Sequence, residues 1–177
     1  MLLRPIDPLE VEAVVDVHRR AFGSDVEADL ARALMLDDAF VRTLSFVAED
    51  GGRLLGHVLF SRSWLARDDG EPGFPLLVLA PLAVVPESQH EGVGTTLVEA
   101  AIARARESGE IGMLVFGDPA YYGRFGFTDA WAKGVRTPHP AEPTWGWQAL
   151  ELAEGVLGPS GILRVAPPLD APEMWIA

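Results

Sequence analysis

The chain has 177 residues, of which 49% are hydrophobic, and this length and composition are typical of one domain with a sizeable core. Its 26 acidic and 14 basic residues give a formal net charge of −12, which argues against a surface that wraps nucleic acid or lies on an anionic membrane. The chain has no cysteine, so disulfides, thiolate metal sites and a cysteine nucleophile are excluded.

The sequence shows neither the apolar run of a membrane-spanning helix nor the apolar centre of a signal peptide. No apolar run approaches the roughly 20 residues that cross a bilayer, and Arg4, Asp7 and Glu10 stand where a signal peptide has its apolar centre. We therefore expect a cytoplasmic protein. A single domain is expected over residues 1–177, with the proline-rich residues 166–177 as an extended C-terminal tail.

Two helices are predicted near the N-terminus, after a short apolar edge strand at residues 1–6. Asp7 is followed by proline and, three positions on, by glutamate, which is the pattern of an N-cap with a capping box. Gly23 ends this first helix. Ser24 and Glu27 repeat the capping-box spacing before a second helix.

A β-hairpin is predicted next. Residues 44–49 and 54–61 are apolar and rich in β-branched or aromatic side chains, and the Asp-Gly-Gly sequence at 50–52 supplies the turn chemistry between them. The polar, glycine-containing residues 67–73 then return the chain to a strongly apolar strand at 76–85.

A glycine loop and a helix follow this apolar strand. Gly92 and Gly94 lie in the loop, and the apolar residues from Leu97 to Ala105 repeat at the spacing of one helix face before Gly109 ends the helix. In such an arrangement, unpaired N–H groups and the positive end of the helix dipole converge on one point. The sequence therefore predicts a cradle for a phosphate group.

A second apolar strand at residues 111–116 completes a strand–helix–strand unit, so it should run parallel to the strand at 76–85. Asp118 then begins a short helix that Gly126 ends. Two late strands are expected at residues 148–152 and 161–165.

Two common classes of phosphate site do not fit this loop. A P-loop needs a lysine after its last glycine, and none follows Gly94. A dinucleotide-binding loop needs a third glycine and an acidic residue at the end of the next strand, which here ends at Phe116 and Gly117. The order of two helices followed by a hairpin also conflicts with a doubly wound fold.

Residues 82–94 resemble motif A of the GNAT N-acetyltransferases, whose core pattern is Gln/Arg-x-x-Gly-x-Gly/Ala after a strand. The pattern is met at Gln89, Gly92 and Gly94. Residues 117–127 are similar to the aromatic helix-to-strand segment of the same superfamily, in the form found in its YhbS-like branch. The resemblance implies the α/β (α+β) GNAT acyl-CoA N-acyltransferase fold, with a mixed, mostly antiparallel sheet whose parallel pair is splayed to admit acetyl-CoA.

Acetyl-CoA is the co-substrate that the resemblance implies. The backbone of three strand residues would hydrogen-bond its pantetheine arm and thioester, and these are Leu82, Ala83 and Val84. The backbone N–H groups of the loop would converge on its pyrophosphate, and the residues concerned are Gln89, His90, Glu91, Gly92, Val93, Gly94 and Thr95.

Tyr122 corresponds to the tyrosine that many GNAT enzymes place beside the thioester sulfur. A phenol with a pKa of about 10 is protonated at neutral pH and is able to protonate a departing thiolate. Tyr121 is the alternative acid, although we expect it to pack the short helix against the core. Arg124 has two open roles, one near the phosphates of the cofactor and one in an exposed ion pair.

The general base is not identified by the sequence. His57 lies on a predicted strand and either faces the acceptor or is satisfied within the core, and His18 falls on the apolar face of the first helix. His90 would act through its backbone, and His139 carries no catalytic signal. With four histidines and no HExxH-type spacing, we expect no metal site.

The leading hypothesis is an N-acetyltransferase that moves the acetyl group of acetyl-CoA directly to a primary amine of a small molecule, peptide or protein. The alternative is a catalytically silent acetyl-CoA-binding sensor or interaction module on the same fold. The sequence contains both the glycine loop and Tyr122, which favours the enzyme, because a binding module needs the loop but not the tyrosine. No nucleic-acid or membrane partner is expected, and the sequence does not specify the acceptor, the preferred acyl group or the oligomeric state.

Overall fold

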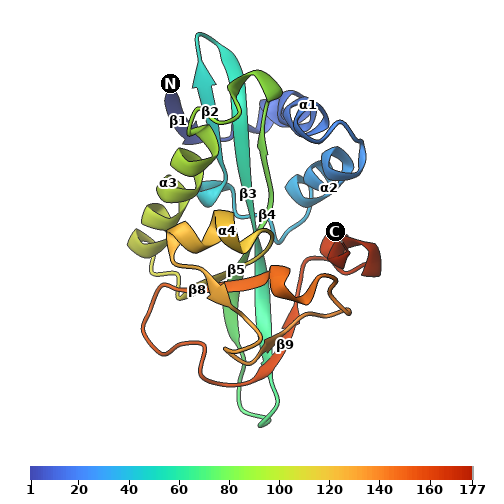
Figure 1. Ribbon diagram of the computed structural model, residues 1–177, viewed down its shortest axis with the longest axis vertical. Helices are drawn as coiled ribbons and strands as arrows, with labels where there is room; N and C mark the ends of the chain where they lie inside the picture. Colours follow the sequence, from blue (N-terminus) through green and yellow to red (C-terminus); the bar gives the residue numbers. More distant parts are fainter. Residues whose placement is uncertain (177) are drawn as a thin grey trace. The chain divides into compact units, whose positions relative to one another are not determined.

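A computed structural model describes residues 1–176 (Figure 1). The chain forms two compact units, one made of residues 1–60 and 80–105 and the other of residues 61–79 and 106–177. Strands β3 (Arg53–Arg67) and β4 (Phe74–Val84) contribute residues to both units. Among the described residues, no helix combines the length and the apolar character needed to cross a membrane.

The first unit contains an antiparallel meander. β1 (Leu2–Pro5) pairs only with β2 (Phe46–Asp50) in the described ladders, and β2 pairs with the first half of β3 from Val58 to Arg53. Gly51 and Gly52 connect β2 to β3 with φ angles of 55° and 79°, the left-handed pair that a tight hairpin turn requires. The predicted hairpin is therefore present, and β3 continues beyond its predicted end.

Three helices accompany this meander, and their bounds are α1 Val11–Phe22, α2 Val26–Met35 and α3 Val93–Glu107. The predicted capping box is formed at Asp7 and Glu10, around a 3-10 turn that leads into α1. Gly23 ends α1 in the left-handed conformation. Asp25 is the N-cap of α2, so the predicted Ser24–Glu27 capping box is not formed. The Ser24 hydroxyl instead accepts from the Val26 N–H at 3.0 Å and donates to the Glu27 carboxylate at 2.7 Å.

In the second unit β4 pairs in parallel with β5 (Gly112–Phe116) over Leu77–Leu79. This confirms the predicted parallel pair, while the separation of the two strands beyond Leu79 stays a prediction. β5 pairs antiparallel with β8, and the last residues of β3 pair antiparallel with β9. The remaining bounds are β6 Thr128–Asp129, β7 Val135–Arg136, β8 Trp147–Glu151, β9 Gly161–Arg164 and α4 Pro119–Tyr122.

The C-terminal residues differ from the extended tail that their prolines predict. Two 3-10 turns, Pro167–Leu169 and Pro172–Trp175, shape the segment. Trp175 is only 2% exposed, its Nε1 donates to the Leu169 carbonyl at 3.0 Å, and its ring centroid lies 5.3 Å from that of Trp147. The prediction of an extended tail is wrong for residues 166–176 because a buried indole anchors them, and Ala177 lies outside the described residues.

Candidate functional site

The strand end, glycine loop and helix predicted to hold a phosphate lie together in the first unit. β4 ends at Val84, and a 3-10 turn at Pro86–Ser88 leads into the loop. The Val85 N–H donates to the Leu55 carbonyl at 2.9 Å, which fastens the start of this turn to β3. This hydrogen bond therefore fixes the position at which the chain leaves β4 and enters the loop.

Two residues of the loop have left-handed backbone angles, His90 with φ of 63° and Gly92 with φ of 84°. The Gly92 carbonyl accepts hydrogen bonds from both the backbone N–H (2.9 Å) and the hydroxyl (3.0 Å) of Thr96, so Gly92 directly precedes α3 and accepts its first helical hydrogen bond. The N–H groups of Val93, Gly94 and Thr95 belong to the first helical turn, where no intrahelical acceptor exists. The positive end of the α3 dipole thus lies at the loop, where it favours the binding of an anionic group.

Space for a ligand is open beside this loop. Apart from Gly92 and its two chain neighbours, no described residue has a heavy atom within 4 Å of the position that a Cβ on Gly92 would take. Gln89, His90 and Glu91 are exposed. The Gln89 side-chain amide donates to the Val84 carbonyl at 3.0 Å and ties the loop back to the end of β4. The loop residues thus fit a phosphate group, and the structure places them in the same unit as Leu82–Val84.

The strand residues of the site, Leu82–Val84, pack closely against β3. Ala83 is 2% exposed, and Leu82 and Val84 are half-buried. A Cβ added to Gly56 on β3 would lie 2.8 Å from the Ala83 carbonyl oxygen and 3.0 Å from a methyl group of Leu97 on α3. Only glycine allows β3, β4 and α3 to approach this closely.

Tyr122 lies in the second unit, at the end of α4. The Asp118 carboxylate caps this helix by accepting from the Ala120 N–H at 2.8 Å, as predicted. The Tyr122 ring is 9% exposed, its centroid lies 5.7 Å from that of Phe127, and a Cβ on Gly117 would come within 2.5 Å of it. Burial raises the Tyr122 pKa, so the hydroxyl carries its proton throughout the neutral range.

Arg124 contacts the neighbouring Tyr121, and its role near the phosphates of the cofactor stays a prediction. Its guanidinium carbon lies 4.4 Å from the centroid of the Tyr121 ring, and its Nε donates to the Tyr121 carbonyl at 2.9 Å. This cation–π contact holds the Arg124 guanidinium over the Tyr121 ring.

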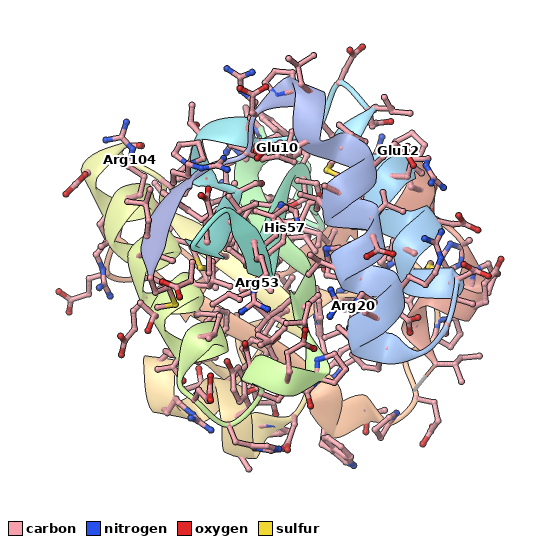
Figure 2. The ribbon with its side chains drawn as sticks, turned by 90° about the horizontal axis from the view of Figure 1, so that it is seen from above. Glu10, Glu12, Arg20, Arg53, His57 and Arg104 are labelled. Atoms are coloured by element: carbon pink, nitrogen blue, oxygen red, sulfur yellow. The ribbon has the colours of Figure 1, made fainter. Side chains whose placement is uncertain are left out.

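The two central histidines form a buried pair that the sequence did not predict. His18 Nε2 and His57 Nδ1 are 2.9 Å apart, and both residues are fully buried. Figure 2 marks the place of His57. Burial lowers the His18 pKa to about 4, and burial together with the charge of His18 lowers the His57 pKa as well. Both imidazoles are therefore neutral at pH 7. His18 thus lies on the buried face of α1, as its spacing predicts, and His57 faces another core side chain.

Further contacts of this region escaped prediction because they join residues far apart in the sequence. Arg20, in the last turn of α1, donates to Glu87 in the turn before the glycine loop, 67 positions away. Each residue taken alone is an ordinary surface charge. No local pattern in the chain could have paired them.

Similar proteins identify the family of the chain. The profile of the Acetyltransferase (GNAT) family matches residues 11–127. The uncharacterized N-acetyltransferase YjhQ of Escherichia coli is 37% identical over 92% of this chain and 90% of its own length, and YhbS from the same organism is 33% identical over 93% and 95%.

Solved structures agree with these sequence matches. The crystal structure of E. coli YhbS in complex with CoA superposes with a TM-score of 0.84 and 29% identity, covering 96% of this chain and 92% of that one. A GNAT acetyltransferase from Brucella melitensis, in complex with acetyl-CoA, gives a TM-score of 0.76 and 28% identity over 96% and 97%.

Proposed function

Since this chain belongs to the GNAT acetyltransferase family and uses acetyl-CoA as its acyl donor, we propose that it acetylates a primary amine of a small molecule, peptide or protein by direct transfer. The observation that carries the proposal is the turn from β4 into α3, where Gly92 opens the backbone beside the positive end of the helix. Acetyl-CoA supplies the acetyl group as a thioester.

The loop would bind the diphosphate of the cofactor through backbone N–H groups, with Val93, Gly94 and Thr95 in the first turn of α3 as the best-placed donors. The backbone of Leu82, Ala83 and Val84 would hold the pantetheine arm, and one N–H there would polarise the thioester carbonyl. Neither role needs a reactive side chain. We therefore expect cofactor affinity to depend on backbone geometry in this stretch.

Tyr122 is the residue that we propose as the acid. When the amine nitrogen bonds to the carbonyl carbon and the C–S bond breaks, the departing thiolate would take the Tyr122 proton. The proton that the amine nitrogen loses would return to the Tyr122 oxygen, directly or through water, so that Tyr122 ends the step protonated. Burial strengthens the hold of Tyr122 on its proton. The thiolate, with a pKa of about 8.5 in water, must therefore also be desolvated to receive it.

A tyrosine exchange tests this assignment. Tyr122→Phe keeps the ring that packs on Phe127 and removes only the hydroxyl, so we expect kcat to fall by roughly a hundredfold with little change in acetyl-CoA affinity. Tyr121→Phe is the matched control, since its ring also packs in α4, and it should retain nearly full turnover. Release of free thiol from acetyl-CoA measures turnover. Wild-type turnover in Tyr122→Phe, or an equal loss in both variants, would remove Tyr122 as the acid.

A further inference from the structure

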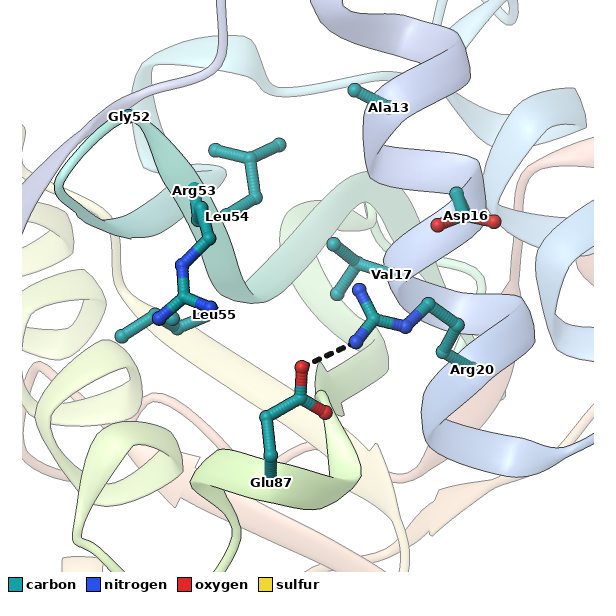
Figure 3. Close-up of a pocket in the computed structure, with 9 residues that line it drawn as sticks. All are labelled: Ala13, Asp16, Val17, Arg20, Gly52, Arg53, Leu54, Leu55 and Glu87. Carbon is teal, nitrogen blue, oxygen red and sulfur yellow. Dashed lines mark hydrogen bonds and ion pairs between the residues drawn. The ribbon is translucent and has the colours of Figure 1, made fainter.

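The first unit contains a pocket of about 280 Å³ that the proposed reaction does not use. One wall is the exposed side of α1 with Arg20, the opposite wall is the start of β3 with Arg53, and Glu87 closes the end (Figure 3). We call it the Arg20–Arg53 pocket. Its nine lining residues are Ala13, Asp16, Val17, Arg20, Gly52, Arg53, Leu54, Leu55 and Glu87.

The charges in this pocket leave one cation uncompensated. Glu87 accepts a hydrogen bond from Arg20, and Asp16 lies 3.7 Å from Arg19 on the same helix. The Arg53 guanidinium has no hydrogen-bonded or ion-paired partner within residues 1–176, although its charge acts on Glu87 from the other wall. Figure 3 shows the guanidiniums of Arg20 and Arg53 on either side of the Glu87 carboxylate. An incoming anion would meet two guanidinium groups.

Apolar groups form the inner surface of the pocket. Val17 is 2% exposed and packs with Ala83 and Val85, and Leu54 packs against the same cluster. A ligand with a short hydrocarbon part would cover this surface while its anionic end stays near the pocket mouth. The volume limits the ligand to the size of a small metabolite.

A single negative charge fits better than two. Asp16 and Glu87 both line the pocket, so a phosphate dianion would be repelled by two carboxylates. A carboxylate matches the fork of a guanidinium and carries one charge. The Arg20–Glu87 pair costs little to open or share, because both side chains are about half exposed, at 44% and 53%.

We propose that the Arg20–Arg53 pocket binds a small organic carboxylate, which accepts hydrogen bonds from Arg53 and Arg20 and lays its apolar part on Val17 and Leu54. The ligand would contact Arg20 next to Glu87, and Glu87 lies in the turn that leads into the glycine loop. The site is separate from the residues assigned to acetyl-CoA, and the inference does not depend on the proposed function.

Titration of the ¹⁵N-labelled full chain with butyrate, in the absence of acetyl-CoA, tests the proposal. We expect saturable amide shifts at residues 13–20, 52–55 and 87. Arg53→Gln should weaken butyrate about tenfold, the effect of losing a charged hydrogen-bond donor. Arg42→Gln is the matched control, because Arg42 is also exposed and lies outside the pocket, and it should leave the affinity unchanged.

Butylamine and inorganic phosphate serve as comparison ligands in the same titration. Weak or absent binding of both supports the carboxylate assignment. The proposal is overturned if butyrate gives no saturable shifts, if the shifts appear at residues 89–95 instead, if Arg53→Gln binds butyrate as well as the wild type, or if phosphate binds more tightly than butyrate through Arg53.

Discussion

Gly92 combines two properties that bear on its role in the loop. Its φ of 84° lies in the left-handed region, and the space that a Cβ would fill is empty. The first property makes a non-glycine residue strained at this position by roughly 1 kcal/mol. The second means that a side chain would block the approach of a ligand without striking the protein itself.

Gly92→Ala should therefore separate binding from folding. We expect a loss of about 1 kcal/mol in the free energy of unfolding and a decrease of at least about tenfold in acetyl-CoA affinity. Gly109→Ala is the control, since Gly109 has a similar φ of 76° and equally open space at the far end of α3. Calorimetry with acetyl-CoA compares the two variants at matched stability. Unchanged affinity in Gly92→Ala would remove the phosphate role of the loop.

At the scale of elements, Gly56 is the position where β3, β4 and α3 come closest. A methyl group there would press on the Ala83 carbonyl, on Leu97 and on Val93, the residue that begins α3. Gly56→Ala should cost about 1–3 kcal/mol in stability and weaken acetyl-CoA binding, because both sides of the candidate cofactor site would shift. Gly123→Ala, in a helical turn with open space, should change neither property. Thermal unfolding and calorimetry report the two effects, and equal behaviour of the variants would contradict this packing account.

The pairing of α1 with β3 depends on two imidazoles that remain neutral. The unfolded chain protonates histidine near pH 6.5, while the folded chain keeps the His18 pKa at about 4 and the His57 pKa also below its ordinary value. Between these limits the unfolded state binds more protons than the folded state. The contribution of the two histidines to the free energy of unfolding is therefore fully present above pH 6.5 and decreases as the pH falls below that value.

For His18 alone, this fall amounts to about 1.4 kcal/mol per pH unit, or roughly 3 kcal/mol by pH 4. Carboxylates such as Glu10, whose pKa Arg4 lowers, titrate at lower pH, so the interval from about 6.5 to 5 reports the histidines. Urea unfolding across this interval measures the slope. His18→Leu should reduce the slope, whereas His90→Asn, at an exposed residue with φ of 63°, should leave it unchanged. A flat profile in the wild type would contradict the buried neutral pair.

For the whole molecule, the predicted GNAT fold and the YhbS-like assignment are confirmed by the family match and by the structure of YhbS. The features that sequence predicted well have local causes. The capping box at Asp7 and Glu10, the Gly51–Gly52 turn and the Asp118 cap each depend on residues at most three positions apart. Their chemistry is therefore readable from a short segment.

Features with long-range causes were missed. The burial of Trp175 depends on Trp147, and the Arg20–Glu87 and His18–His57 contacts join α1 to distant segments. Within the candidate site, Gln89 and Gly92 were placed in the loop by their spacing, whereas the close approach of Gly56 became visible only in the folded chain. The roles of the loop residues and of Tyr122 in catalysis stay predictions.

A single-turnover experiment on the full chain tests the central claim, direct acetyl transfer to a primary amine, most directly. The protein is mixed with limiting acetyl-CoA, with and without a panel of primary amines, and free thiol, acetylated amine and intact protein mass are measured after quenching. We predict thiol release only with an accepted amine, one acetylated amine for each thiol, and no mass gain on the protein. The claim would be contradicted by thiol release without amine, by an acetylated protein, or by a cofactor-bound protein that acetylates no amine in the panel.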